Sequence, residues 1–171
     1  MGFSEKQREI LRFPYQCYDA LICDGAVRSG KTSVMSLSFF LWAMGRFNGC
    51  AFALCGKSVG AVERNIVTPL LAVQYLRQNF TISYSRSGHV ITARRGVREN
   101  RFYLFGGKDE SSYTLIQGIT LAGVLLDEVA LMAPLFCGTG HGPVLRDRGK
   151  VMVQLQPGGA AKALVPAGSG F

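Results

Sequence analysis

The chain has 171 residues, the length of one ordinary domain, and its 48% hydrophobic and 18% charged residues are typical of a globular protein. No apolar run approaches the roughly 20 residues of a membrane-spanning helix, and the N-terminus carries no recognisable secretion signal, so we expect no membrane association and a cytoplasmic location. The net charge of +8 favours a polyanionic partner such as nucleic acid, although many proteins of this basicity bind none.

The first predicted elements alternate between helix and strand. Residues 4–13 begin with a serine suited to an N-cap and predict a short helix, and the apolar run 20–24 before a glycine predicts a buried strand. Residues 32–44 predict a helix packed against a sheet, and 50–55 a second buried strand. Strand, helix, strand is the order of a parallel α/β sheet.

The next stretch adds a helix and then a hairpin. Residues 59–78 have helical periodicity, with Pro69 as a kink or break. Further on, β-branched and aromatic residues predict two hairpin strands and a third strand, followed by a short helix and one more buried strand. These five segments are 80–84, 89–94, 102–105, 109–116 and 121–126.

The composition changes after Met132. From Ala133 to Phe171 there are eight glycines, four prolines and no sustained periodicity, which predicts irregular chain. We therefore expect an α/β fold with a mostly parallel sheet flanked by helices, an inserted β-hairpin and an irregular C-terminal tail. The predicted organisation is a folded domain over residues 1–132 and a tail over 133–171.

The number and spacing of the cysteines argue against disulfide bonds and against a zinc site. The cysteines are odd in number and include no Cys-x-x-Cys pair, so neither a disulfide framework nor a zinc site is indicated. We expect reduced thiols, most of them buried. The residues are Cys17, Cys23, Cys50, Cys55 and Cys137.

A phosphate-binding loop follows the first predicted strand and matches G-x-x-x-x-G-K-T in full. Its glycines let successive backbone N–H groups face the phosphates, and the N-terminus of the next helix adds partial positive charge. Lys31 is expected to reach the β- and γ-phosphates of ATP, and the Thr32 hydroxyl to ligate Mg²⁺. The match identifies the expected α/β fold as that of a P-loop NTPase, with an ATPase-like domain over residues 1–132. The alternative is a glycine-containing turn that matches by chance. The predicted nucleotide-binding residues of the loop are Gly25, Ala26, Val27, Arg28, Ser29, Gly30, Lys31 and Thr32.

Two carboxylates stand at the end of the last buried strand. Because ligands of open α/β sheets bind at the carboxyl ends of the strands, Asp127 is expected to hold Mg²⁺ and Glu128 to act on the attacking water. The alternative is a strand that ends in two solvated acids.

Other residues support weaker interpretations. Gln7 could hydrogen-bond adenine or be an ordinary surface glutamine. Arg28 could reach a phosphate or a neighbouring subunit as a catalytic group, or point to solvent. An arginine cluster near the hairpin could contact a DNA backbone or simply be solvated. Its members are Arg94, Arg95, Arg98 and Arg101.

Over residues 3–132 the sequence resembles the ATPase domain of the large terminase subunit of tailed bacteriophages and prophages. The motifs that carry this resemblance are Ser4-Glu5-Lys6-Gln7, the loop Gly25 to Thr32, Ser112 to Gly118, and Gly123 to Ala130. The resemblance implies a ring-shaped motor at the capsid portal that hydrolyses ATP and drives double-stranded DNA into procapsids. It also implies the portal protein and the small terminase subunit as partners, and catalytic roles for Lys31, Arg28 and Glu128.

The sequence departs from this family after Met132. The family's nuclease and its Asn-Pro coupling turn are not recognised, so we expect a truncated domain with impaired activity. One extra nucleotide in the codon of Ala133 would explain this, because the shifted frame permits M-P-R-S-F-V-E-Q-A from Met132 onward. In that case residues 133–171 would be poorly packed.

Two other functions remain open from the sequence. One is a helicase-like, DNA-dependent P-loop ATPase, which would need further motifs and a second domain. The other is a remnant that binds nucleotide without turnover.

Overall fold

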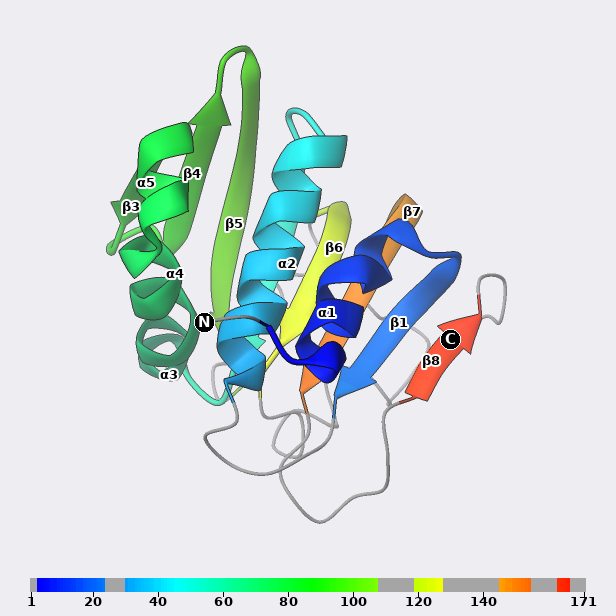
Figure 1. Cartoon of the computed structure of the whole chain (residues 1–171). Helices are drawn as coiled ribbons and strands as arrows, with labels where there is room; N and C mark the ends of the chain where they lie inside the picture. The colour runs from blue at the N-terminus through cyan, green and yellow to red at the C-terminus, as the bar shows by residue number, and fades with distance from the viewer. Residues whose placement is uncertain (1–2, 24–29, 108–118, 128–144, 155–162, 167–171) are drawn as a thin grey trace.

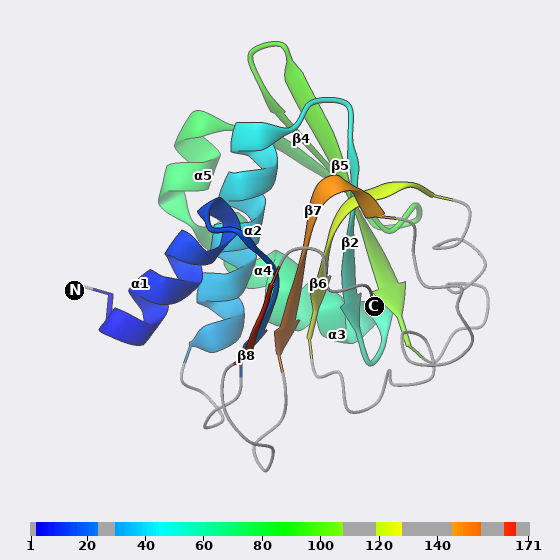
Figure 2. The ribbon, with the colours of Figure 1, turned by 90° about the vertical axis from the view of Figure 1, so that its right-hand side faces the viewer.

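The computed structural model describes residues 3–23, 30–107, 119–127, 145–154 and 163–166. Within these residues the chain forms an eight-stranded sheet in the order β3-β4-β5-β2-β6-β7-β1-β8, with α1 and α2 packed across one face (Figure 1). In the perpendicular view α1, α2 and α5 again lie on one side of the strands (Figure 2). The described part of the chain contains no helix that is long and apolar enough to cross a membrane.

The centre of the sheet is parallel. Strand β2 pairs with β5 and β6, and β7 pairs with β6 and β1, all in parallel register. The carboxyl ends of these strands therefore meet at one edge, the lower edge in Figure 1. The five strands are β1 (Tyr18–Cys23), β2 (Ala51–Gly56), β5 (Arg98–Gly106), β6 (Leu121–Leu126) and β7 (Leu145–Gln154).

Antiparallel strands complete the two sides. Strands β3 (Thr81–Ser85) and β4 (Val90–Arg95) form a hairpin that joins the sheet through β5. On the other side, β8 (Ala163–Pro166) runs antiparallel to β1. The predicted mostly parallel sheet with an inserted hairpin is thus confirmed.

Helix α1 (Glu5–Arg12) begins at a capping box. The Ser4 hydroxyl accepts from the Gln7 amide, and the Gln7 side chain accepts in return from the Ser4 amide. This exchange satisfies two N–H groups that a helix start would otherwise leave unpaired. A 3-10 turn, η1 (Phe13–Tyr15), then leads into β1.

Helix α2 (Lys31–Arg46) carries the main core, which buries aromatic rings against the sheet. Phe39 packs edge-on against Phe52, and Phe40 stacks on Phe102 with ring centroids 5.1 Å apart. Burial of such side chains contributes about 1.5–3 kcal/mol each. Helix α2 is therefore held firmly against the sheet, with its first turn near the carboxyl edge.

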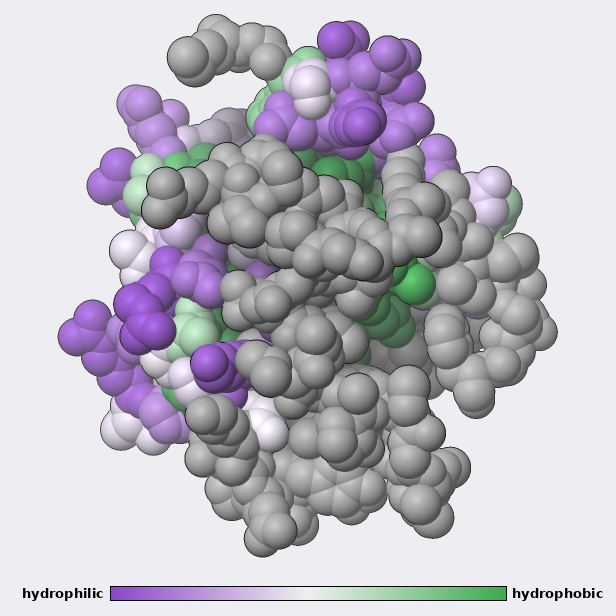
Figure 3. Space-filling model, turned by 90° about the horizontal axis from the view of Figure 1, so that it is seen from below, coloured by the Kyte–Doolittle hydropathy of each residue, from purple (hydrophilic) through white to green (hydrophobic). Residues whose placement is uncertain are grey.

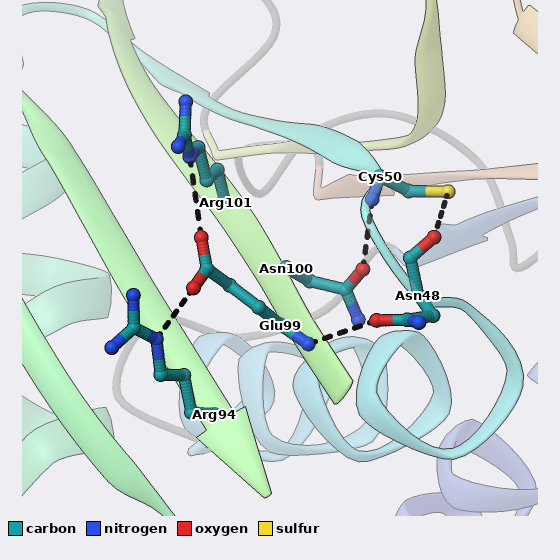
Figure 4. A network of polar contacts seen from close by, with 6 residues as sticks. All are labelled: Asn48, Cys50, Arg94, Glu99, Asn100 and Arg101. Atoms are coloured by element: carbon teal, nitrogen blue, oxygen red, sulfur yellow. Dashed lines mark hydrogen bonds and ion pairs between the residues drawn. The ribbon is translucent and has the colours of Figure 1, made fainter. Parts of the chain in front are cut away.

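Strand β5 caps the C-terminal end of α2. The buried Asn100 amide donates to the carbonyls of Ala43 and Phe47, and its oxygen accepts from the Cys50 amide at 3.0 Å. Figure 4 shows Asn100 beside Cys50, and Glu99 donating its backbone N–H to Asn48. Asn100 thus ties the C-terminal end of α2 and the residues after it to β5, although the Ala43 carbonyl also accepts from the Phe47 amide.

The predicted helix over residues 59–78 is divided into four pieces. A π-helical segment follows a short α-helix, because Pro69 has no N–H to donate to the carbonyl of residue 65. The chain breaks again at Val73, which is extended. The pieces are α3 (Val59–Val62), η2 (Glu63–Val67), α4 (Thr68–Ala72) and α5 (Gln74–Asn79).

The prediction of irregular chain after Ala133 is wrong for residues 145–154 and 163–166, which form β7 and β8. Met152 of β7 is fully buried, so this strand is well packed, unlike the poorly packed tail that an out-of-frame sequence would give. The strand was missed because Gly149 and Lys150 interrupt its apolar pattern. Lys150 is nonetheless buried: its ammonium donates to the carbonyls of Gln16 and Tyr18, which meets the cost of burying the charge. The alternative reading frame itself concerns the coding DNA and stays a prediction.

Candidate nucleotide-binding site

Two chain segments meet at the carboxyl edge of the sheet. The first is the start of α2, the helix that follows β1, where Lys31 and Thr32 lie in the first helical turn. The second is Asp127, the residue that directly follows β6. Strands β1 and β6 are separated by β7, and the parallel direction of all three strands brings the two segments to the same edge.

Thr32 and Asp127 lie next to each other. The Thr32 hydroxyl donates a long hydrogen bond of 3.5 Å to Oδ1 of Asp127. The Asp127 side chain is buried, and its backbone N–H donates to the Cys55 carbonyl at 2.8 Å, which fixes the carboxylate beside the end of β2. The sequence predicted that the phosphate loop and the acidic strand end lie close together, and Thr32 and Asp127 do so.

A third side chain also contacts Asp127. Asn65, in the π-helical segment η2, donates from Nδ2 to Oδ2 of Asp127 at 3.0 Å. Sequence reasoning missed this residue because the helical periodicity of 59–78 gives no sign of a π turn. The signal that could have found it is Pro69, four residues further on, which disrupts the helix at Asn65.

Gln7 lies beside the end of the phosphate loop. A Cβ atom built on Gly30 would be 3.7 Å from Nε2 of Gln7. The Gln7 oxygen is engaged by the Ser4 amide at 3.0 Å, so the capping box leaves the NH₂ end of the side chain on the side of Gly30. The predicted contact with adenine stays a prediction.

Several predicted site residues lie outside the described residues. They are Gly25, Ala26, Val27, Arg28, Ser29 and Glu128, together with the motif from Ser112 to Gly118 and Cys137. Of the other cysteines, Cys17 is exposed and Cys23, Cys50 and Cys55 are buried, all as free thiols. Burial raises the pKa of the Cys55 thiol. Cys55 lies near the end of β2, and its carbonyl accepts from the Asp127 amide.

The arginine cluster near the hairpin is engaged by the protein. Arg94 and Arg101 both pair with Glu99, as Figure 4 shows. Arg98 donates to the Gly45 carbonyl at 2.6 Å, and Arg95 lies over the Phe80 ring. Each of the four therefore has a contact within this chain, and the predicted DNA contact stays a prediction.

The described residues suit a magnesium nucleotide. Gly30, at the N-cap of α2, has the left-handed φ of 71°, and the N-terminus of this 16-residue helix carries the partial positive charge that favours an anion. A hydroxyl and a carboxylate are the oxygen donors that Mg²⁺ prefers. Seen from below, on the side of the carboxyl ends, the described residues are mainly hydrophilic at the periphery, with hydrophobic atoms in places nearer the centre (Figure 3).

Comparison with solved structures finds similar folds in phage large terminases. The large terminase of a thermophilic bacteriophage is 39% identical over 91% of this chain and 39% of its own, with a TM-score of 0.75. A structure of the same protein with ADP is 35% identical over 90% of this chain and 39% of that one, with a TM-score of 0.73.

A more distant structure shows the same fold. The large terminase ATPase domain of a Thermus phage is 15% identical, with a TM-score of 0.62, over 94% of this chain and 67% of that chain. No family model and no curated protein matches the sequence. The chain spans about two fifths of the length of the first relative, 39%. By sequence and fold the chain belongs to the large terminase family of bacteriophages and has the fold of its ATPase domain.

Proposed function

We propose that this domain binds and hydrolyses ATP with Mg²⁺ as the motor of a large terminase that drives double-stranded DNA into procapsids. The observation that carries the proposal is the contact between Thr32 and Asp127, which unites the phosphate loop and the acidic strand end. A terminase solved with ADP and with ATP-gamma-S, 35% and 34% identical to this chain, supports a nucleotide as the ligand.

Each residue has a distinct role in this proposal. The backbone from Gly25 to Lys31 binds the phosphates, and the Lys31 ammonium neutralises charge on the β- and γ-phosphates. Thr32 and Asp127 hold the metal, directly or through water. Magnesium at this place would neutralise the charge that develops on the transferred phosphoryl group.

Two further side chains complete the proposed chemistry. The Glu128 carboxylate accepts the proton of the attacking water, and Arg28 stabilises the phosphate oxygens. Gln7 contributes a hydrogen bond to adenine from the side of α1.

The proposed partners follow from the family. They are double-stranded DNA, the portal protein, the small terminase subunit and further copies of this chain in a ring, all in the cytoplasm of the bacterial host. The positive net charge of +8 favours the DNA contact.

Nucleotide binding tests the site. Calorimetric titration with ATP and Mg²⁺ is expected to show binding by the wild type and a large loss in Lys31→Ala, because one phosphate-binding cation is removed. Arg77→Ala on α5 removes one charge elsewhere and should leave the affinity unchanged. A wild-type chain that binds no nucleotide would refute the assignment.

Turnover tests Glu128. Glu128→Gln keeps the size of the side chain but cannot accept the proton, so phosphate release should stop while nucleotide affinity is retained. Equal turnover by the variant and the wild type would exclude Glu128 as the base. Binding without turnover by the wild type would instead favour the nucleotide-binding remnant.

A further inference from the structure

Asn65 contacts the one described acidic side chain of the site from outside both nucleotide motifs. Its Nδ2 donates to Oδ2 of Asp127, whereas the other oxygen, Oδ1, accepts from the Thr32 hydroxyl. The two oxygens of Asp127 are thus engaged by different elements: Oδ1 by the first turn of α2 and Oδ2 by η2.

The local backbone explains how Asn65 reaches this carboxylate. Residues 63–67 form a π turn, in which the Thr68 amide donates to the Glu63 carbonyl, five residues back. Pro69 disfavours an ordinary α turn here, since it lacks the N–H that would bond to the Asn65 carbonyl. Single π turns of this kind occur frequently at functional sites.

The π turn is anchored on both sides of Asn65. On one side, Glu63 pairs with Arg86 of the hairpin at 2.9 Å. On the other, Ile66 and Val67 are buried in the main core. Asn65 itself is exposed, so its side chain contributes little to the packing of the domain.

We infer that Asn65 is a positioning residue for the metal-binding carboxylate. By holding Oδ2, Asn65 sets the orientation of the Asp127 carboxylate and keeps Oδ1 turned toward Thr32. In that orientation Oδ1 and the Thr32 hydroxyl oxygen could bind the same metal ion. Hydrogen bonds of this kind to a metal ligand fix its orientation, and their loss typically lowers metal affinity by about 10–100-fold. The inference rests on the proposed nucleotide site.

Magnesium-dependent binding provides the test. Asn65→Leu and Asn65→Ala both remove the side-chain amide. Leucine is similar to asparagine in size, whereas alanine is smaller and cannot clash with its neighbours. Asn79→Leu is the matched control, since Asn79 is a partly exposed asparagine on α5 whose amide donates to the Tyr75 carbonyl. Each protein is titrated with Mg²⁺ at fixed ATP, and separately with ATP in EDTA, and its melting temperature is measured without nucleotide.

The positioning role predicts a split between these measurements. Both Asn65 variants should need at least about tenfold more Mg²⁺ than the wild type, with unchanged affinity for ATP in EDTA and a cooperative melting transition that shows a folded domain. Asn79→Leu should match the wild type in both titrations.

Two results would overturn the inference alone. One is a magnesium titration of both Asn65 variants that coincides with that of the wild type. The other is an equal loss of ATP affinity with Mg²⁺ and with EDTA, which would make Asn65 a direct nucleotide contact. A wild-type chain that binds no nucleotide at all would instead refute the proposed function.

Discussion

The Thr32 hydroxyl lies 3.5 Å from the Oδ1 atom of Asp127, although 95 positions separate the two residues in the sequence. The contact joins the first turn of α2 to the end of β6, the two segments that hold the metal in the proposed site. Its chemistry can be tested at either end, and Thr32 is the better choice because its neighbour Asp127 is buried.

Replacement of Thr32 by valine is expected to weaken binding of the magnesium nucleotide about tenfold. Valine keeps the branched shape and removes the hydroxyl that we propose as a metal ligand, whereas Thr32→Ser keeps the hydroxyl and should bind like the wild type. A titration with Mg²⁺ at fixed ATP measures both. If the valine and serine variants behave alike, the hydroxyl has no role.

Asn100 is expected to be a major determinant of stability. Asn100→Leu would leave the Cys50 amide and the carbonyls of Ala43 and Phe47 without this buried partner, at a cost of about 1–3 kcal/mol for a buried group. We therefore expect the free energy of unfolding, measured in denaturant, to fall by at least about 2 kcal/mol. Asn79→Ala, at the partly exposed end of α5, should change it by less than about 0.5 kcal/mol. Similar values for both variants would contradict the role of this network.

Two glycines should respond to alanine in opposite directions. A Cβ atom on Gly123 in β6 would lie 2.8 Å from the Trp42 ring and 3.1 Å from the Lys150 carbonyl, so Gly123→Ala should destabilise by about 1–3 kcal/mol. A Cβ atom on Gly45 in α2 meets nothing within 4 Å, so Gly45→Ala should stabilise by about 0.5–1 kcal/mol through helix propensity. Thermal unfolding of both variants checks the signs, and equal effects would contradict the packing at Gly123.

The thiols should differ in reactivity. Cys17 is exposed, whereas Cys55 is fully buried and burial raises the pKa of its thiol, which reduces the reactive thiolate. Alkylation of the native protein, followed by peptide mapping, should modify Cys17 at least about tenfold faster than Cys55. In denaturant the two rates should become similar. Fast labelling of native Cys55 would show that the end of β2 opens to solvent.

Much of the parallel sheet could be predicted because its strands are uniform apolar runs bounded by glycine or charge. Residues 121–126 coincide with β6, and the hairpin is displaced by one residue from its predicted range. Thr32 and Asp127 could be predicted as a pair because parallel strands align their carboxyl ends.

The remaining differences have local causes. A π turn depends on one proline and not on periodicity, so Asn65 was hidden in a segment that resembled a single helix. Strand β7 was missed for a different reason: Lys150 is polar in sequence yet finds carbonyl partners from Gln16 and Tyr18, which are more than 130 residues away. Contacts of this range are absent from any local pattern.

The position of β7 between β6 and β1 has a consequence for how the chain folds during synthesis. Residues 18–23 and 121–126 leave the ribosome first, but they are not neighbours in the sheet and are joined only when residues 145–154 pair with both. The proposed nucleotide site can thus be completed only after β7 has been made, and ATP should protect nascent chains from proteolysis only after β7 has emerged. Protection of a stalled chain that ends before residue 145 would disprove this order of assembly.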